Sequence, residues 1–186
     1  MRKLSVVLLL TLSLVLESRA ATTPSTTVQF VFTSDSHFGL TRKAFRGAEN
    51  VNASVVNAAL VAAINALPAA MIPKDGGIGG NASVGPIDFV ANAGDLANRA
   101  ETTDGGQIQP ASASWAEFRR IYLEGVHVRS RDGELAPVFA VPGNHDVSNA
   151  VGFHRPMVPA TDPSSMVGLY NLMMRPQAAL TPDRDQ

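Results

Sequence analysis

Three short apolar runs, rich in β-branched and aromatic residues, divide the chain into repeating segments. They cover residues 28–33, 87–91 and 138–141, and their composition predicts buried strands. Apolar and polar residues do not alternate along these runs, as they do in strands with one face in water. We therefore expect a sheet that is covered on both of its faces.

Apolar residues at helical spacing follow the first two predicted strands. Residues 47–67 carry such a stripe, and Pro68 predicts the end of that helix. Ser114 and Glu117 have the spacing of a capping box, which predicts the start of a second helix that ends at Gly125. Between these segments, glycine-rich and polar stretches are typical of loops.

The third strand is followed by a helix that begins at Asp162, just before a proline, and ends before Pro176. Its apolar residues share one face, and we expect the methionines among them to pack in the core: Met166, Val167, Tyr170, Met173 and Met174. The order is therefore strand, helix, strand, helix, strand, helix, which predicts an α/β fold.

The N-terminus has the features of a secretory signal peptide. A short basic start precedes an apolar stretch at residues 4–16, and small residues suit cleavage after Ala20. Because a membrane span needs about 20 apolar residues, a cleaved signal is favoured over an anchor. We expect a signal peptide at 1–20, a flexible leader at 21–27, and a secreted or periplasmic protein with no membrane attachment after cleavage.

Composition and charge exclude several kinds of function. The 186 residues include 15 Lys and Arg against 16 Asp and Glu, so the chain lacks the basic footprint of a nucleic-acid-binding protein. It has no cysteine, which excludes disulfides, cysteine zinc sites and thiol nucleophiles. A hydrophobic fraction of 45% is that of an ordinary globular domain.

Polar residues follow each predicted strand, at the end where open α/β sheets place their sites. Asp35 and His37 follow the first strand, Asp95 follows the second, and a Gly-Asn-His-Asp run at 143–146 follows the third. These residue types supply oxygen and nitrogen ligands for divalent transition metals. We therefore expect them to meet at one edge of the sheet and to bind metal.

Taken together, the three motifs resemble those of the calcineurin-like metallophosphoesterase family. The resemblance covers about residues 28–150, and it implies a β-sandwich flanked by helices. It also implies hydrolysis of a phosphoester substrate at two transition metal ions, with iron, manganese or zinc all compatible with the donor set. The substrate itself is not indicated, because monoesters, diesters, nucleotides and phosphoproteins all undergo this chemistry.

The resemblance also assigns roles to individual residues. It implies that the metal ligands are Asp35, His37, Asp95 and Asn144. Among them, Asp95 would bridge the two ions. It implies that His145 contacts the phosphate or protonates the leaving oxygen. Asp146 would lie behind His145 and orient its ring.

The second half of the family's pattern, a further metal-binding histidine and a Gly-His-x-His motif, is missing. The chain has four histidines, of which only His154 follows the third motif, and it is followed by Arg-Pro. We expect residues 28–186 to be the N-terminal half to two-thirds of the domain. Weak metal binding, severely impaired hydrolysis and an uncovered apolar sheet surface would follow.

Two alternatives stay open. One is a non-catalytic secreted relic of the fold that binds metal weakly or binds a partner. The other is a surface protein held by an uncleaved signal, whose metal motifs are structural. Both share the predicted fold. The relic differs from the enzyme in having no turnover, and the surface protein differs in keeping its N-terminal signal and in using the metal motifs for structure.

Overall fold

The computed structural model describes residues 27–100, 109–147 and 162–182, so the predicted signal peptide and most of the leader lie outside the described residues. Three parallel strands form a sheet in the order β1–β4–β5. Their bounds are Phe30–Thr33, Phe89–Asn92 and Val138–Ala140. Each strand overlaps one of the three predicted runs, so the predicted α/β arrangement of strands is confirmed.

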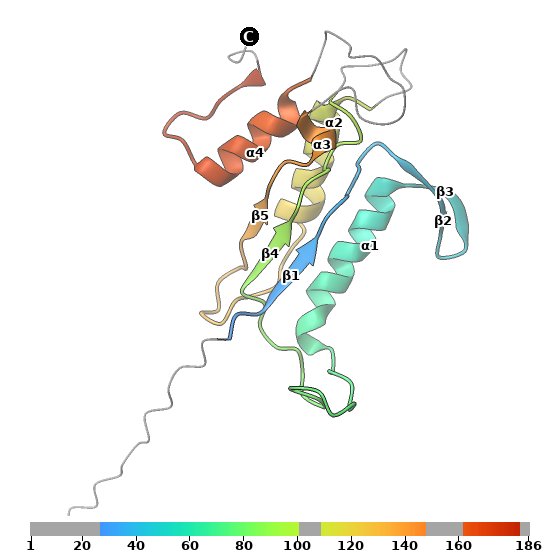
Figure 1. Cartoon of the computed structure of the whole chain (residues 1–186), viewed down its shortest axis with the longest axis vertical. Helices are drawn as coiled ribbons and strands as arrows, with labels where there is room; N and C mark the ends of the chain where they lie inside the picture. Colours follow the sequence, from blue (N-terminus) through green and yellow to red (C-terminus); the bar gives the residue numbers. More distant parts are fainter. Residues whose placement is uncertain (1–26, 101–108, 148–161, 183–186) are drawn as a thin grey trace, which may run out of the picture.

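The long helices lie on one face of this sheet (Figure 1). Helix α1 spans Ala53–Ala66 and ends in a 3-10 turn, η1, at Leu67–Ala69. Helix α2 spans Ala111–Phe118 and continues as a π-helical segment, η2, at Arg119–Leu123. The main core lies between these helices and the sheet, and its central residues are Val61, Ile64, Val90, Phe118, Ile121, Tyr122 and Ala140.

The opposite face of the sheet is apolar and exposed, so the prediction of two covered faces is wrong. Phe30, Phe32 and Phe139 are 50%, 66% and 40% exposed, and Phe30 stacks on Phe89 with ring centroids 4.7 Å apart. The cause is topological. Strand β4 lies beside β1, and β5 lies on the far side of β4, so the sheet grows in one direction. Because connections between parallel strands are right-handed, both crossovers then place their helices on the same face of the sheet.

A β-hairpin precedes α1, where the apolar pattern predicted a longer helix. Its strands are β2, Thr41–Phe45, and β3, Ala48–Asn52. Arg46 and Gly47 turn the chain with φ values of 50° and 84°. The Asn52 side chain then accepts a hydrogen bond of 2.8 Å from the Ser54 N–H, and this cap starts α1 six residues later than predicted.

A single carboxylate, that of Asp162, caps two helices. Its Oδ2 accepts the Ser112 N–H of α2 at 2.7 Å, and its Oδ1 accepts the Ser164 N–H of α4 at 3.0 Å. The predicted capping box is wrong, because Ser114 lies inside α2 and its buried hydroxyl donates to the Phe38 carbonyl. The predicted cap is displaced by one residue, because Pro163 is the N-cap of α4 and Asp162, just before it, accepts the first helical N–H.

Helix α4 spans Ser164–Met174 and packs on α2 through small residues. A side chain at Gly168 would place its Cβ 2.2 Å from the Trp115 ring, so only glycine fits there. The predicted core packing of Met173 and Met174 is wrong, because these side chains are exposed beside the edge strand β5. Within the described ranges, no helix is long and apolar enough to cross a membrane.

Candidate metal centre

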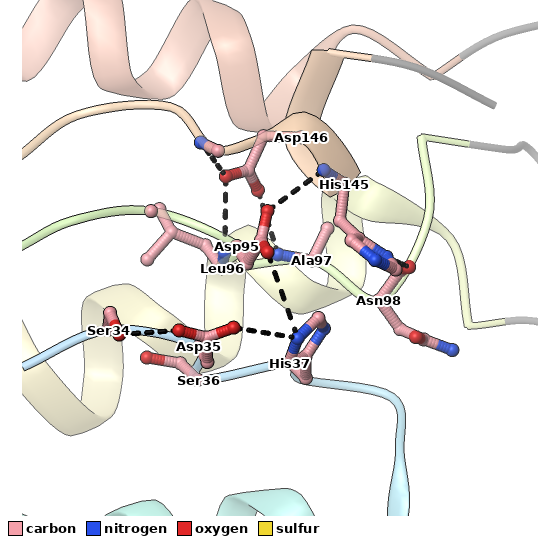
Figure 2. Close-up of polar contacts among 12 residues, drawn as sticks. Ser34, Asp35, Ser36, His37, Asp95, Leu96, Ala97, Asn98, His145 and Asp146 are labelled. Carbon is pink, nitrogen blue, oxygen red and sulfur yellow. Dashed lines mark hydrogen bonds and ion pairs between the residues drawn. The ribbon is translucent and has the colours of Figure 1, made fainter. Parts of the chain in front are cut away.

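The segments that follow β1, β4 and β5 meet at the carboxyl end of the sheet, as the motifs predicted (Figure 2). The first two segments continue the parallel pairing beyond their strands. The Asp35 N–H donates to the Gly94 carbonyl at 3.0 Å, and the His37 N–H donates to the Asp95 carbonyl at 2.8 Å. This pairing fixes the first two motifs to each other through their backbones.

Two glycines allow the second and third segments to approach closely. Gly94 has a φ of 97°, and a Cβ on it would lie 2.2 Å from the backbone nitrogen of Gly143. A Cβ on Gly143 would lie 2.1 Å from Asp95 Oδ1. Glycine at both positions therefore leaves room for the Asp95 carboxylate between the two loops.

Three of the predicted site residues adopt left-handed backbone conformations. The φ values are 57° for Asp35, 44° for His37 and 53° for Asp95. Such conformations are uncommon for residues other than glycine, and they collect at functional sites because the surrounding structure must hold them. Here they turn the side chains of all three residues toward one position.

The polar side chains converge on His37. Its Nε2 lies 3.5 Å from Asp35 Oδ1 and 3.9 Å from Asp95 Oδ2, and its ring packs edge-on against the His145 ring at 4.6 Å between centroids. Ligand atoms of His37, Asp95 and His145 all lie within 4.8 Å of one another. Asp35 is the outermost member, with a side chain that is 64% exposed.

His145 is oriented by the backbone of the second motif. Its Nδ1 lies 2.5 Å from the Asn98 carbonyl oxygen, and its backbone N–H donates to Asp95 Oδ1 at 2.9 Å. Because a carbonyl oxygen only accepts, Nδ1 carries the proton and Nε2 keeps a lone pair. This arrangement, with one imidazole nitrogen held by a carbonyl, is common among histidines that bind metals.

Asp146 does not orient the His145 ring, which corrects the sequence-based expectation. It is 1% exposed, and its carboxylate accepts the Leu96, Ala97 and Gly143 N–H groups at 3.2, 2.9 and 2.9 Å. Burial raises the pKa of Asp146, and these three donors partly offset the rise. Its carboxylate therefore joins the second motif to the third and sets their distance.

The protonation states of the cluster favour cation binding. Burial and the neighbouring His145 lower the pKa of His37, against the opposing charges of Asp95 and Asp35. The Ser34 hydroxyl, which donates to Asp35, lowers the pKa of that carboxyl. Neutral imidazole and ionised carboxylate are the forms that bind metals.

The donor set also fits a transition metal ion. It combines carboxylate oxygens with imidazole nitrogens, whereas calcium and magnesium sites use oxygen ligands. The buried Nδ1 of His37 finds no hydrogen-bond partner in the described part of the chain. A buried polar atom without a partner is unusual, and it is the only such side-chain atom among the described residues.

Comparison with known proteins agrees with this geometry. The family model for calcineurin-like phosphoesterases matches residues 28–178, which is most of the chain. The chain belongs to the calcineurin-like phosphoesterase family. Searches of the curated proteins and of the solved structures found no match. The family assignment supports metal-dependent phosphoester hydrolysis as the general activity.

Two further residues bear on this calcineurin-like phosphoesterase site. Asn144, predicted as a ligand, is exposed at the first residue of the short helix α3, Asn144–Val147, next to His145. Arg42 of β2 was not predicted, and its Nη2 lies 3.3 Å from the Asp35 carbonyl oxygen. Arg42 follows the first motif closely in the chain, and the turn between them, in which the Leu40 N–H donates to the His37 carbonyl at 3.1 Å, leaves Arg42 in contact with Asp35.

Proposed function

We propose that this chain is a phosphoesterase whose metal ion is held by Asp35, His37 and Asp95, with Asn144 at the rim of the site. The observation that carries the proposal is the convergence of His37, Asp95 and His145 ligand atoms within 4.8 Å, from three separate strand ends, with Asp35 Oδ1 3.5 Å from His37 Nε2. A transition metal ion bound there supplies a Lewis acid that stabilises negative charge on a phosphoryl group.

The remaining chemistry falls to groups around this cluster. His145 carries its proton on Nδ1, so its Nε2 accepts a proton or, when charged, delivers one to the leaving oxygen. Arg42 presents a guanidinium, which pairs with phosphate oxygens by two parallel hydrogen bonds. Asp146 acts through the backbone, by holding the loops that carry Asp95 and His145.

We further propose that the two metal positions are unequal. The first has three residues of the cluster, whereas the second would depend on Asp95, which is shared, and on the neutral amide of Asn144. Fewer charged ligands mean weaker binding, so the second ion is expected to bind loosely and hydrolysis to be slow. The non-catalytic alternative differs only in having no turnover.

The test is a titration of the full chain with Mn²⁺ by calorimetry, together with hydrolysis of p-nitrophenyl phosphate and bis(p-nitrophenyl) phosphate. We expect about one ion per chain at the first position, bound more tightly than any second ion, and slow, Mn²⁺-dependent hydrolysis. Asp95→Asn should abolish tight binding. Glu49→Gln, which removes an exposed charge on β3, is the matched control and should leave binding unchanged.

Two outcomes would count against the proposal. A folded chain that binds no Mn²⁺ contradicts the metal centre itself. Tight binding that Asp95 governs, with no hydrolysis of either ester, would favour the non-catalytic alternative and contradict the enzymatic role.

A further inference from the structure

We infer that Asn57 of α1 is a positioning residue for the metal centre, because a buried polar network centred on it holds the loop between Asp35 and His37. The inference rests on the proposed function and adds to it. The side chains proposed to surround the metal take no part in this network. All of the network's hydrogen bonds join described residues.

The first part of the network joins α1 to the loop. Asn57 is buried, and its Nδ2 donates to the Ser36 carbonyl at 2.8 Å and to the Ala53 carbonyl at 2.9 Å. Its Oδ1 accepts the hydroxyl of Tyr122 at 3.1 Å. Each polar atom of the Asn57 side chain therefore has a partner, and the orientation of its amide is determined.

The second part reaches the same serine from the sheet. Asn92, the last residue of β4, donates from Nδ2 to the Ser36 hydroxyl at 3.1 Å and to the Thr33 hydroxyl at 3.2 Å. Its Oδ1 accepts the Gly94 N–H at 2.9 Å. Two buried amides thus hold Ser36 from two sides, one at its carbonyl and one at its hydroxyl.

Ser36 is the residue that needs this support. It lies between Asp35 and His37, whose left-handed backbone conformations are strained for residues other than glycine. Such conformations persist only where the surroundings favour them over relaxed alternatives. The bond from Asn57 to the Ser36 carbonyl acts on the peptide that leads into His37, so it bears directly on the direction of the His37 ring.

Tyr122 lies in the π-helical segment η2, which packs against α1. A π-helical turn is wider than an α-helical turn, is rare, and often occurs at functional sites. The Tyr122 ring is packed by Phe38 and Phe118, with centroids 6.5 and 5.0 Å away. Because these contacts are apolar, the hydroxyl is the group that links η2 to the network.

The test compares Asn57→Leu with Asn65→Leu, a matched control on the same helix. Asn65 likewise uses both atoms of its amide, donating to the Gly125 carbonyl and accepting the His127 N–H, but at the far end of α1. We expect Asn57→Leu to weaken Mn²⁺ binding about 10-fold or more, as for other residues that orient metal ligands. Asn65→Leu should lower the melting temperature comparably and leave Mn²⁺ affinity unchanged.

A readout without metal keeps the inference testable on its own. Hydrogen exchange of the Asp35 and His37 amides, which donate to Gly94 and Asp95, should accelerate in Asn57→Leu and not in Asn65→Leu. If Asn57→Leu does not fold, Tyr122→Phe, which keeps the ring and removes the hydroxyl, should show the same change at smaller amplitude. Equal exchange in wild type and variants would overturn the inference, whereas absent Mn²⁺ binding by the wild type would overturn only the metal centre.

Discussion

At the scale of single residues, Asp95 connects all three motifs. Its carbonyl accepts the His37 N–H, its Oδ1 accepts the His145 N–H, and its Oδ2 faces His37 Nε2. The importance of Asp95 was predictable, because an acid after a buried strand is a local pattern. The role of Asp146 was not predictable, since its partners Leu96 and Ala97 are 50 and 49 positions away in the chain.

His37 makes the stability of the metal-free protein depend on pH. The pKa of His37 is lowered below its ordinary value of 6.5, so well above pH 6.5 the residue is neutral in both folded and unfolded chains. As the pH falls below 6.5, the unfolded chain takes up the proton first, and stability is lost. Melting in EDTA at pH 7.5 and 5.5 should show a larger loss for wild type than for His37→Asn; an equal loss would contradict this.

Arg42 is expected to bind the phosphate group of the substrate. With Mn²⁺ bound, Arg42→Ala should weaken the binding of inorganic phosphate roughly 10-fold, which is about 1.4 kcal/mol for one charge-assisted pair. Lys43→Ala removes the same charge from the neighbouring position on β2 and serves as the control. Calorimetric titration with phosphate measures both. Equal effects of the two substitutions would show that only the overall charge matters.

At the scale of elements, the three strands were predictable because each is a single local run of apolar residues. The β2–β3 hairpin was missed because its strands lack a clear alternation and its turn is Arg46-Gly47 in place of Asn-Gly. The start of α2 was misplaced because its cap, Asp162, comes from a distant part of the chain. A contact with a distant residue thus decided the start of α2, whereas local contacts that the apolar pattern did not indicate set the hairpin and the start of α1.

Asp162 should contribute more to stability than an ordinary capping residue. Asp162→Ala removes the cap of α2 and that of α4, and a lost cap costs about 0.5–2 kcal/mol. We expect the free energy of unfolding in urea to fall by about 2 kcal/mol. Asp132→Ala removes exposed turn contacts within one loop, to the Ser130 hydroxyl and the Glu134 N–H, and should cost less than about 0.5 kcal/mol. A similar cost for both variants would contradict the double cap.

At the scale of the whole molecule, the described residues cover one face of the sheet and leave the other face bare. Two sequence-based expectations differed here: the incomplete set of family motifs predicted an uncovered apolar surface, whereas the strands themselves predicted two covered faces. In the residues that the structure describes, the only other sheet is the β2–β3 hairpin. Exposed phenylalanines on a contiguous face favour association in water.

The bare face should bind hydrophobic dyes and promote self-association. Phe32→Gln and Phe139→Gln should each lower the fluorescence of bound anilinonaphthalene sulfonate and reduce light scattering by concentrated protein. Ile78→Gln is the control, because Ile78 is fully exposed in the glycine-rich loop, away from the sheet. A wild-type chain that binds no dye and stays monomeric at high concentration would show that the face is covered.

The central claim is that three strand ends together form a transition metal site. Pulsed electron paramagnetic resonance of the full chain with one equivalent of Mn²⁺ tests it most directly, because it detects nitrogen nuclei bound to the ion. The account predicts coupling to imidazole nitrogen that weakens in His37→Ala and persists in His127→Ala, whose histidine is exposed in a hollow between α1 and η2. A spectrum of fully hydrated Mn²⁺, or one unchanged in His37→Ala, would contradict the account.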